Sequence, residues 1–136
     1  MGPERVGKPA LAAAAFALVA GCGSSSSGDV KAALDDGIAA IRATHDYGEL
    51  RGKLVATIAR LRSTRDGEGR RLAIRGFESM LRGNDSRIAF VENDRGNIEA
   101  ATRDAKRAGA GLRKGATLLR AAGRLLGRKV GTLNGY

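Results

Sequence analysis

From Asp29 onward the aliphatic residues recur every three or four positions, and this spacing restricts the fold more than any other feature. An α-helix turns once in about 3.6 residues, so residues at this spacing share one face and can be buried together. No stretch shows the sustained alternation of apolar and polar residues that is typical of strands. Both prolines precede residue 10 and leave the remainder free to be helical. We therefore expect an all-α fold, a small antiparallel bundle of about four helices.

Two helices are expected in the first half of this domain. The spacing predicts one helix from about residue 30 to 44 and another from about 49 to 63. Asp29 is the expected N-cap of the first. The short connections at 44–48 and 63–67 predict that neighbouring helices are antiparallel. The expected buried faces are Val30, Leu34, Ile38 and Ile41 in the first helix, and Leu50, Leu54, Ile58 and Leu61 in the second.

After Asp66 a heptad-like seam of mostly apolar or small residues follows, with spacings of four and three. From Thr102 onward, one of its two positions is small, which predicts the close approach of a partner helix. The cluster of Gly109, Gly111 and Gly115 is likewise expected to serve close helix packing and not to form a phosphate-binding loop. The members of the seam are Phe77, Leu81, Asn84, Ile88, Val91, Arg95, Ile98, Thr102, Ala105, Gly109, Leu112, Ala116, Leu119, Gly123, Leu126, Val130 and Leu133.

The second half must contain a chain reversal. One helix over residues 68–128 would be roughly 90 Å long at about 1.5 Å per residue, too long for the rest of the chain to cover. Segments 93–97 and 83–86 both contain helix-ending Gly and helix-capping residues. We predict the reversal at 93–97, with 83–86 as the alternative. The helical domain then covers residues 29–128, and residues 129–136 form a C-terminal tail outside the helix.

The first 21 residues have the layout of a signal peptide. Arg5 and Lys8 precede an uncharged and mostly apolar stretch from Ala10 to Ala20. A transmembrane helix needs ~20 apolar residues, so this stretch is too short to span a bilayer. We therefore expect a cleaved leader at residues 1–21.

The leader closes with Leu18-Val19-Ala20-Gly21-Cys22, where small residues stand just before a Cys. This motif resembles the lipobox of bacterial lipoproteins. The resemblance implies cleavage before Cys22, attachment of fatty acyl chains to Cys22, and an extracytoplasmic protein anchored to the cell membrane. Two acyl chains give stable anchoring where one would be marginal. Residues 22–28, rich in Gly and Ser, are the expected flexible linker to the domain.

Residue types for catalysis and metal binding are scarce, because the chain has one Cys and one His. His45 is expected in a turn, solvated or capping a helix, since a catalytic triad or metal site would need partners that the chain lacks. Asp35 with Asp36, and Glu92 with Asp94, are carboxylate pairs of the kind that hydrolases use. We expect them to be solvated surface charges. The sequence therefore predicts no catalytic residue, no cofactor and no metal.

Positive charge is concentrated near the C-terminus. Residues 106–136 hold eight basic and no acidic residues, in a chain of net charge +10. At about 100° per helical residue, seven of them fall within a sector of about 140°, away from the seam. We predict that this face contacts an anionic surface, the alternative being a solvated face that complements the helix dipole. The seven are Lys106, Arg107, Arg113, Lys114, Arg120, Arg124 and Arg128.

Together these features predict a membrane-anchored extracytoplasmic lipoprotein whose helical domain is a binding or structural module of the cell envelope, without catalysis. The expected partners are the bilayer, through acylated Cys22, and anionic lipid headgroups or cell-wall polymers. Nucleic acid is not expected, since the leader directs the protein out of the cytoplasm. The alternatives are a small envelope hydrolase that uses surface carboxylates and a self-assembling coiled-coil homo-oligomer.

Overall fold

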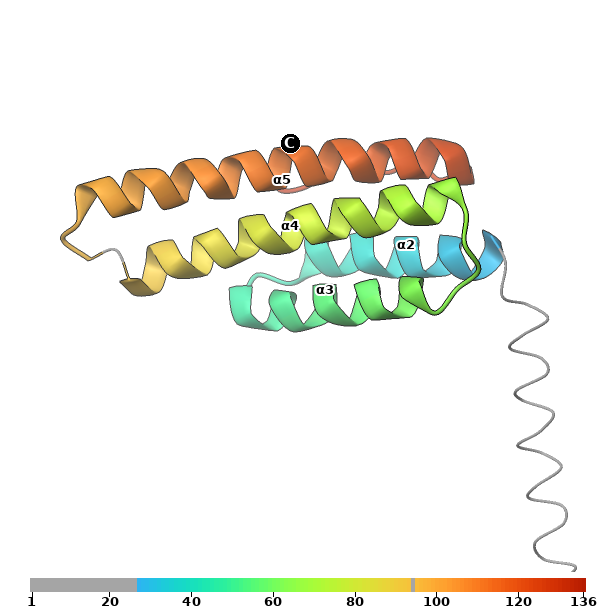
Figure 1. Ribbon diagram of the computed structural model, residues 1–136, viewed down its shortest axis with the longest axis horizontal. Helices are drawn as coiled ribbons and strands as arrows, with labels where there is room; N and C mark the ends of the chain where they lie inside the picture. Colours follow the sequence, from blue (N-terminus) through green and yellow to red (C-terminus); the bar gives the residue numbers. More distant parts are fainter. Residues whose placement is uncertain (1–26, 94) are drawn as a thin grey trace, which may run out of the picture.

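The computed structural model describes residues 27–93 and 95–136, which form an antiparallel bundle of four helices (Figure 1). This confirms the predicted all-α bundle. The predicted leader, Cys22 and the linker as far as residue 26 lie outside the described residues. Among the described residues, no helix is long and apolar enough to cross a membrane. The helices are α2 (Ser27–Ala43), α3 (Tyr47–Arg62), α4 (Glu68–Asn93) and α5 (Ile98–Leu126).

The buried faces predicted for the first two helices are confirmed. All four predicted residues of each helix are at most 6% exposed and lie in one core. The predicted start of the first helix is wrong, because α2 begins at Ser27 and includes the last two residues of the expected linker. Asp29 therefore lies in the first turn, where its carboxylate still faces the positive end of the helix dipole. In α3 the N-cap is Asp46, whose carboxylate accepts a hydrogen bond from the Glu49 backbone N–H at 2.8 Å.

The chain reverses at 93–97, as predicted, and Asn97 caps α5 by accepting a hydrogen bond from the Ala100 backbone N–H at 3.0 Å. The alternative break at 83–86 is wrong, since this segment lies inside α4. Its Gly83 and Asn84 are buried, and the Asn84 side chain donates to the Tyr47 carbonyl at 2.8 Å. The Gly and Asn at this position therefore serve packing and do not end the helix.

Helices α4 and α5 approach each other through glycines. A Cβ placed on Gly111 would lie 2.9 Å from Gly83 Cα, and one placed on Gly115 would lie 2.9 Å from the Gly76 carbonyl oxygen. Both separations are shorter than real Cβ contacts, so only glycine allows this spacing of the two backbones. This confirms at Gly111 and Gly115 the close approach of a partner helix that the sequence predicts. The predicted positions Gly109 and Gly123 face the C-terminal tail instead, at the Tyr136 hydroxyl and the Arg128 carbonyl.

The predicted seam is correct at both ends and wrong in the middle. Phe77, Leu112 and Leu119 are buried, whereas Val91 is 54% and Ile98 82% exposed. Thr102 and Ala105 are exposed as well. The residues of this part of α5 that are buried are Ala100, Asp104 and Ala108. The turn between α4 and α5 shifts the heptad register of α5 relative to that of α4. In the first half of α5, small residues rather than large ones therefore pack against α4.

The C-terminal residues leave the helix as predicted, after Gly127 ends α5 with a left-handed φ of 70°. They return along α5 and pack onto the bundle (Figure 1). Val130 and Leu133 are buried in the same core as the helices. The Arg120 guanidinium donates to the Tyr136 main-chain oxygen at 2.9 Å. This tail is therefore a packed part of the bundle.

Candidate functional site

Four of the seven predicted contact residues lie free on the surface of α5. Lys106, Arg107, Lys114 and Arg124 are exposed, and none takes part in an ion pair within the part of the chain that the structure describes. Their charges are therefore directed at solvent, where an external anion can reach them.

The other three residues have partners inside the bundle. The Arg113 guanidinium lies over the Tyr136 ring, 5.2 Å from its centroid. Arg120 is half-buried and donates to two carbonyl oxygens of the tail. Arg128 pairs with Asp35 of α2, with 3.2 Å between Nε and Oδ2. These side chains hold the tail and the end of α5 in place, a role that the charge pattern did not indicate.

Two of the four free basic residues, Arg107 and Lys114, line a groove between α4 and α5. It has a volume of about 350 Å³, and Arg82 of α4 lines it together with Arg107 and Lys114 of α5. The lining contains no acidic residue. The Ser79 hydroxyl on the wall of the groove donates its hydrogen bond to the Gly111 carbonyl at 2.8 Å, so it cannot also donate to a ligand.

The groove is positively charged because the close approach of α4 and α5 places basic residues of both helices beside it. The contact of Gly111 with Gly83 brings the two backbones together, so cations from both helices flank one depression. Guanidinium groups can bind carboxylate or phosphate oxygens in pairs, and an ammonium group adds a compact charge. Arg82 was not predicted as part of this site, because the charge pattern of α5 alone does not show which residues of α4 pack beside it.

Of the two carboxylate pairs singled out in the sequence, only Asp35 and Asp36 are both described, and they have different partners. Asp36 accepts from Arg60 of α3 at 2.7 Å, whereas Asp35 faces Arg128 after the end of α5. Glu92 is exposed near the end of α4, and Asp94 lies outside the described residues. Among residues 27–93 and 95–136, no three His, Cys, Asp or Glu side chains are grouped so that they could hold a metal ion.

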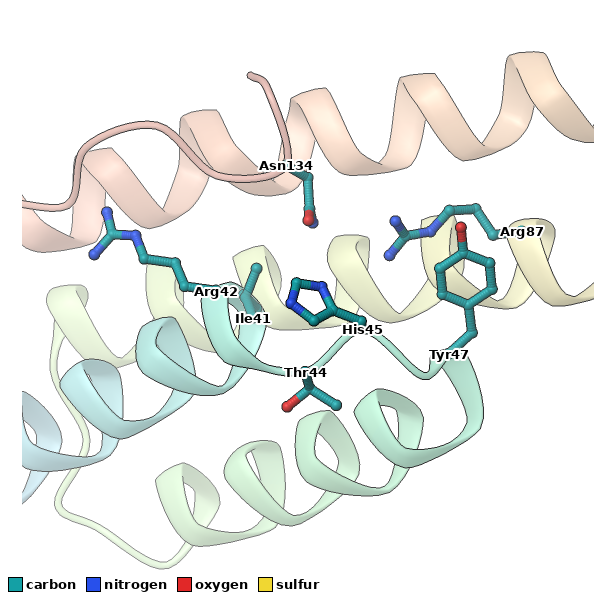
Figure 2. Close-up of a pocket in the computed structure, with 7 residues that line it drawn as sticks. All are labelled: Ile41, Arg42, Thr44, His45, Tyr47, Arg87 and Asn134. Atoms are coloured by element: carbon teal, nitrogen blue, oxygen red, sulfur yellow. The ribbon is translucent and has the colours of Figure 1, made fainter.

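A second, larger pocket lies at the corner between α2 and α3 and has a volume of about 500 Å³ (Figure 2). His45 lines it from the connection between the two helices, where the side chain is exposed as expected for a turn. It is not the cap of α3, which is Asp46. Arg87 of α4 and Asn134 of the tail also line the pocket, and the sequence did not indicate that they meet His45 because both are far from it in the chain.

The chain matches no protein-family model, no curated protein and no solved structure, so we infer its function from the geometry of these two sites.

Proposed function

We propose that this protein is a lipid-anchored module of the cell envelope that docks on anionic lipid headgroups through its α4–α5 groove. The observation that carries the proposal is the convergence of Arg82, Arg107 and Lys114 on a groove without an acidic residue. The anchoring part rests on the lipobox-like motif that ends at Cys22.

The arrangement of the bundle supports a link between the two parts. The start of α2 and the end of α5 lie at the same end of the molecule (Figure 1), where Val30 and Leu126 line one pocket. Cys22 precedes Ser27 by only five residues, which span at most about 18 Å when extended. An acyl group on Cys22 would therefore keep this end of the bundle, with Arg124, close to the headgroups. Lys114 and Arg107 of the groove lie about 15 and 25 Å further along α5, so they reach the same headgroups when the helices lie along the membrane surface.

Contacts between the basic residues and anionic headgroups contribute only a modest binding free energy. This is sufficient for docking when an acyl anchor already holds the protein at the membrane. Each basic residue near an anionic membrane contributes about 1 kcal/mol, and salt screens the attraction beyond ~8 Å at physiological ionic strength. An anchor raises the effective concentration of the surface, so weak contacts become occupied. The groove would then set the orientation of the bundle while the acyl chains supply most of the affinity.

The proposal includes no catalysis. A hydrolase would need two carboxylates directed at one substrate bond. In this bundle Asp35 and Asp36 instead form ion pairs with arginines of two different segments.

Fatty-acid labelling of the wild type and of a Cys22 variant tests whether the protein carries a lipid anchor. We expect the wild-type chain, made in bacterial cells, to incorporate a fatty-acid analogue and to sediment with membranes. Cys22→Ser should remove the label and block cleavage of the leader, because no thiol remains to be acylated. Release of unlabelled wild-type protein into the medium would show that no lipid anchor exists.

Docking is tested by cosedimentation of residues 23–136 with vesicles, after circular dichroism has shown that this fragment is helical and melts cooperatively. We expect binding to phosphatidylglycerol vesicles but not to phosphatidylcholine vesicles, and weaker binding in high salt. The triple variant Arg82→Gln, Arg107→Gln, Lys114→Gln should bind about 100-fold more weakly, at about 1 kcal/mol per lost charge.

The matched control removes three positive charges from the exposed surface of α3, with Arg51, Lys53 and Arg60 changed to Gln. These residues form exposed ion pairs worth about 0–1 kcal/mol each, so the fold should persist. Equal losses in the two triple variants would mean that net charge alone drives binding. Preference for purified cell wall over vesicles would replace the lipid headgroup by a wall polymer as the partner.

A further inference from the structure

The pocket at the α2–α3 corner carries a second inference, which is independent of the proposed function. Its volume of about 500 Å³ lies within the range of ~300–1,000 Å³ typical of small-molecule sites. Four separate parts of the bundle meet there: the end of α2 at Arg42, the α2–α3 connection at His45, Arg87 of α4, and Asn134 of the tail. No acidic residue lines this pocket.

Arg87 is held in a fixed orientation. Its guanidinium lies over the Tyr47 ring, 4.4 Å from the centroid, and its Nη2 donates to Asn84 Oδ1 at 2.9 Å. Asn84 is itself buried and donates to the Tyr47 carbonyl. Stacking and hydrogen bonding on these sides direct the free end of the guanidinium into the pocket, between His45 and Asn134 (Figure 2).

The charge of Arg87 has no carboxylate partner among the described residues. The nearest acid along the chain from His45 is Asp46, and its carboxylate already caps α3 by accepting from the Glu49 N–H. Arg87 Nε is buried without a hydrogen-bond partner, so the protein itself satisfies only part of this guanidinium. A pocket that contains such a cation favours an anionic ligand.

Asn134 is placed over the pocket by a tight turn in the tail. Leu133 and Tyr136 exchange two backbone hydrogen bonds, at 2.9 and 3.1 Å, and Asn134 and Gly135 between them have φ values of 52° and 84°. Two consecutive positive φ angles define a type I′ turn, for which Asn-Gly is the preferred pair. Because Leu133 is fully buried, the turn is fixed to the core and the Asn134 carboxamide is held facing His45 (Figure 2).

We propose that this pocket binds a phosphate group, with Arg87 as the charged anchor and with His45 and Asn134 as additional hydrogen-bond donors. The three donors come from different elements and surround the space from different sides, an arrangement that suits a tetrahedral anion better than a planar carboxylate. Arg42 lies at the rim, where its Nη2 donates to the Val130 carbonyl at 3.5 Å and adds positive potential.

The test is a titration of the isotopically labelled full chain, carrying Cys22→Ser, with inorganic phosphate at constant ionic strength, followed by nuclear magnetic resonance. We expect the backbone amide signals of His45, Tyr47 and Asn134 to shift and saturate. Acetate should give at least tenfold weaker binding. Glycerol phosphate and a water-soluble short-chain phosphatidic acid distinguish a soluble ester from a lipid headgroup, and binding of either one supports phosphate recognition.

Three variants locate the site. Arg87→Gln should weaken phosphate binding at least tenfold. Asn134→Gly should weaken it severalfold, and because glycine accepts positive φ this variant keeps the turn and remains informative if Arg87→Gln fails to fold. Arg75→Gln, an exposed arginine of α4 that lines neither cationic site, should leave phosphate binding unchanged. The proposal is overturned if these signals do not shift, if acetate binds as well, or if Asn134→Gly and folded Arg87→Gln bind phosphate like wild type.

Discussion

Replacement of Leu119 by Asp should unfold the bundle. Leu119 is fully buried on α5 and lies against α4, where a Cβ on Gly76 would be only 2.7 Å from its Cδ2 atom. A carboxylate at this position has no partner and no access to water, and such burial costs several kcal/mol. Small domains are stable by only about 5–15 kcal/mol, so the loss removes most or all of the stability.

The measurement is thermal unfolding followed by far-ultraviolet circular dichroism. The matched control is Leu125→Asp on the same helix, since Leu125 is 54% exposed and its replacement should change stability by less than ~1 kcal/mol. If Leu119→Asp melted at the wild-type temperature, the interface between α4 and α5 could not be the core of the protein.

Replacement of Gly111 by Ala should destabilise the protein, although alanine favours helices by about 1 kcal/mol over glycine. The added methyl would meet Gly83 Cα at 2.9 Å and the Ser79 carbonyl oxygen at 3.0 Å. These are backbone atoms, so α4 and α5 must move apart. Overpacking of this kind typically costs about 1–3 kcal/mol.

Gly52→Ala provides the matched comparison. Gly52 lies inside α3 and is exposed, and a Cβ there would meet nothing within 4 Å. This replacement should stabilise the protein by up to ~1 kcal/mol, because only the helix preference changes. Urea unfolding of both variants measures the difference. Stabilisation by both replacements would refute the glycine-mediated approach of the two helices.

The parts of the fold that the sequence predicted are those in which large aliphatic residues carry the packing. The buried faces of α2 and α3 follow from Leu and Ile at spacings of three and four. The reversal at 93–97 follows from Gly96 and the capping residue Asn97. In the first half of α5, however, Ala100 and Ala108 are buried while Ile98 is exposed. A pattern read from large residues fails where small ones set the distance between helices.

The candidate sites were less predictable, because each combines residues from distant parts of the chain. Charge counting found the basic face of α5 but could not distinguish Arg107, which is free, from Arg120, which holds the tail. Arg82 joins that face only through the packing of α4 against α5. The corner pocket brings together Arg42, Arg87 and Asn134, and no local motif indicates that these residues meet.

The most direct test of the proposed docking surface is the orientation of the bundle on a membrane. Nitroxide labels are attached to Thr117→Cys on α5 and to Ala56→Cys on α3, both exposed, in the vesicle-binding fragment that lacks Cys22. On phosphatidylglycerol vesicles, we predict that the label at position 117 is shielded from an aqueous nickel relaxation agent and that the label at position 56 stays accessible. Equal accessibility of the two labels, or shielding of position 56 alone, would contradict docking through the α4–α5 groove.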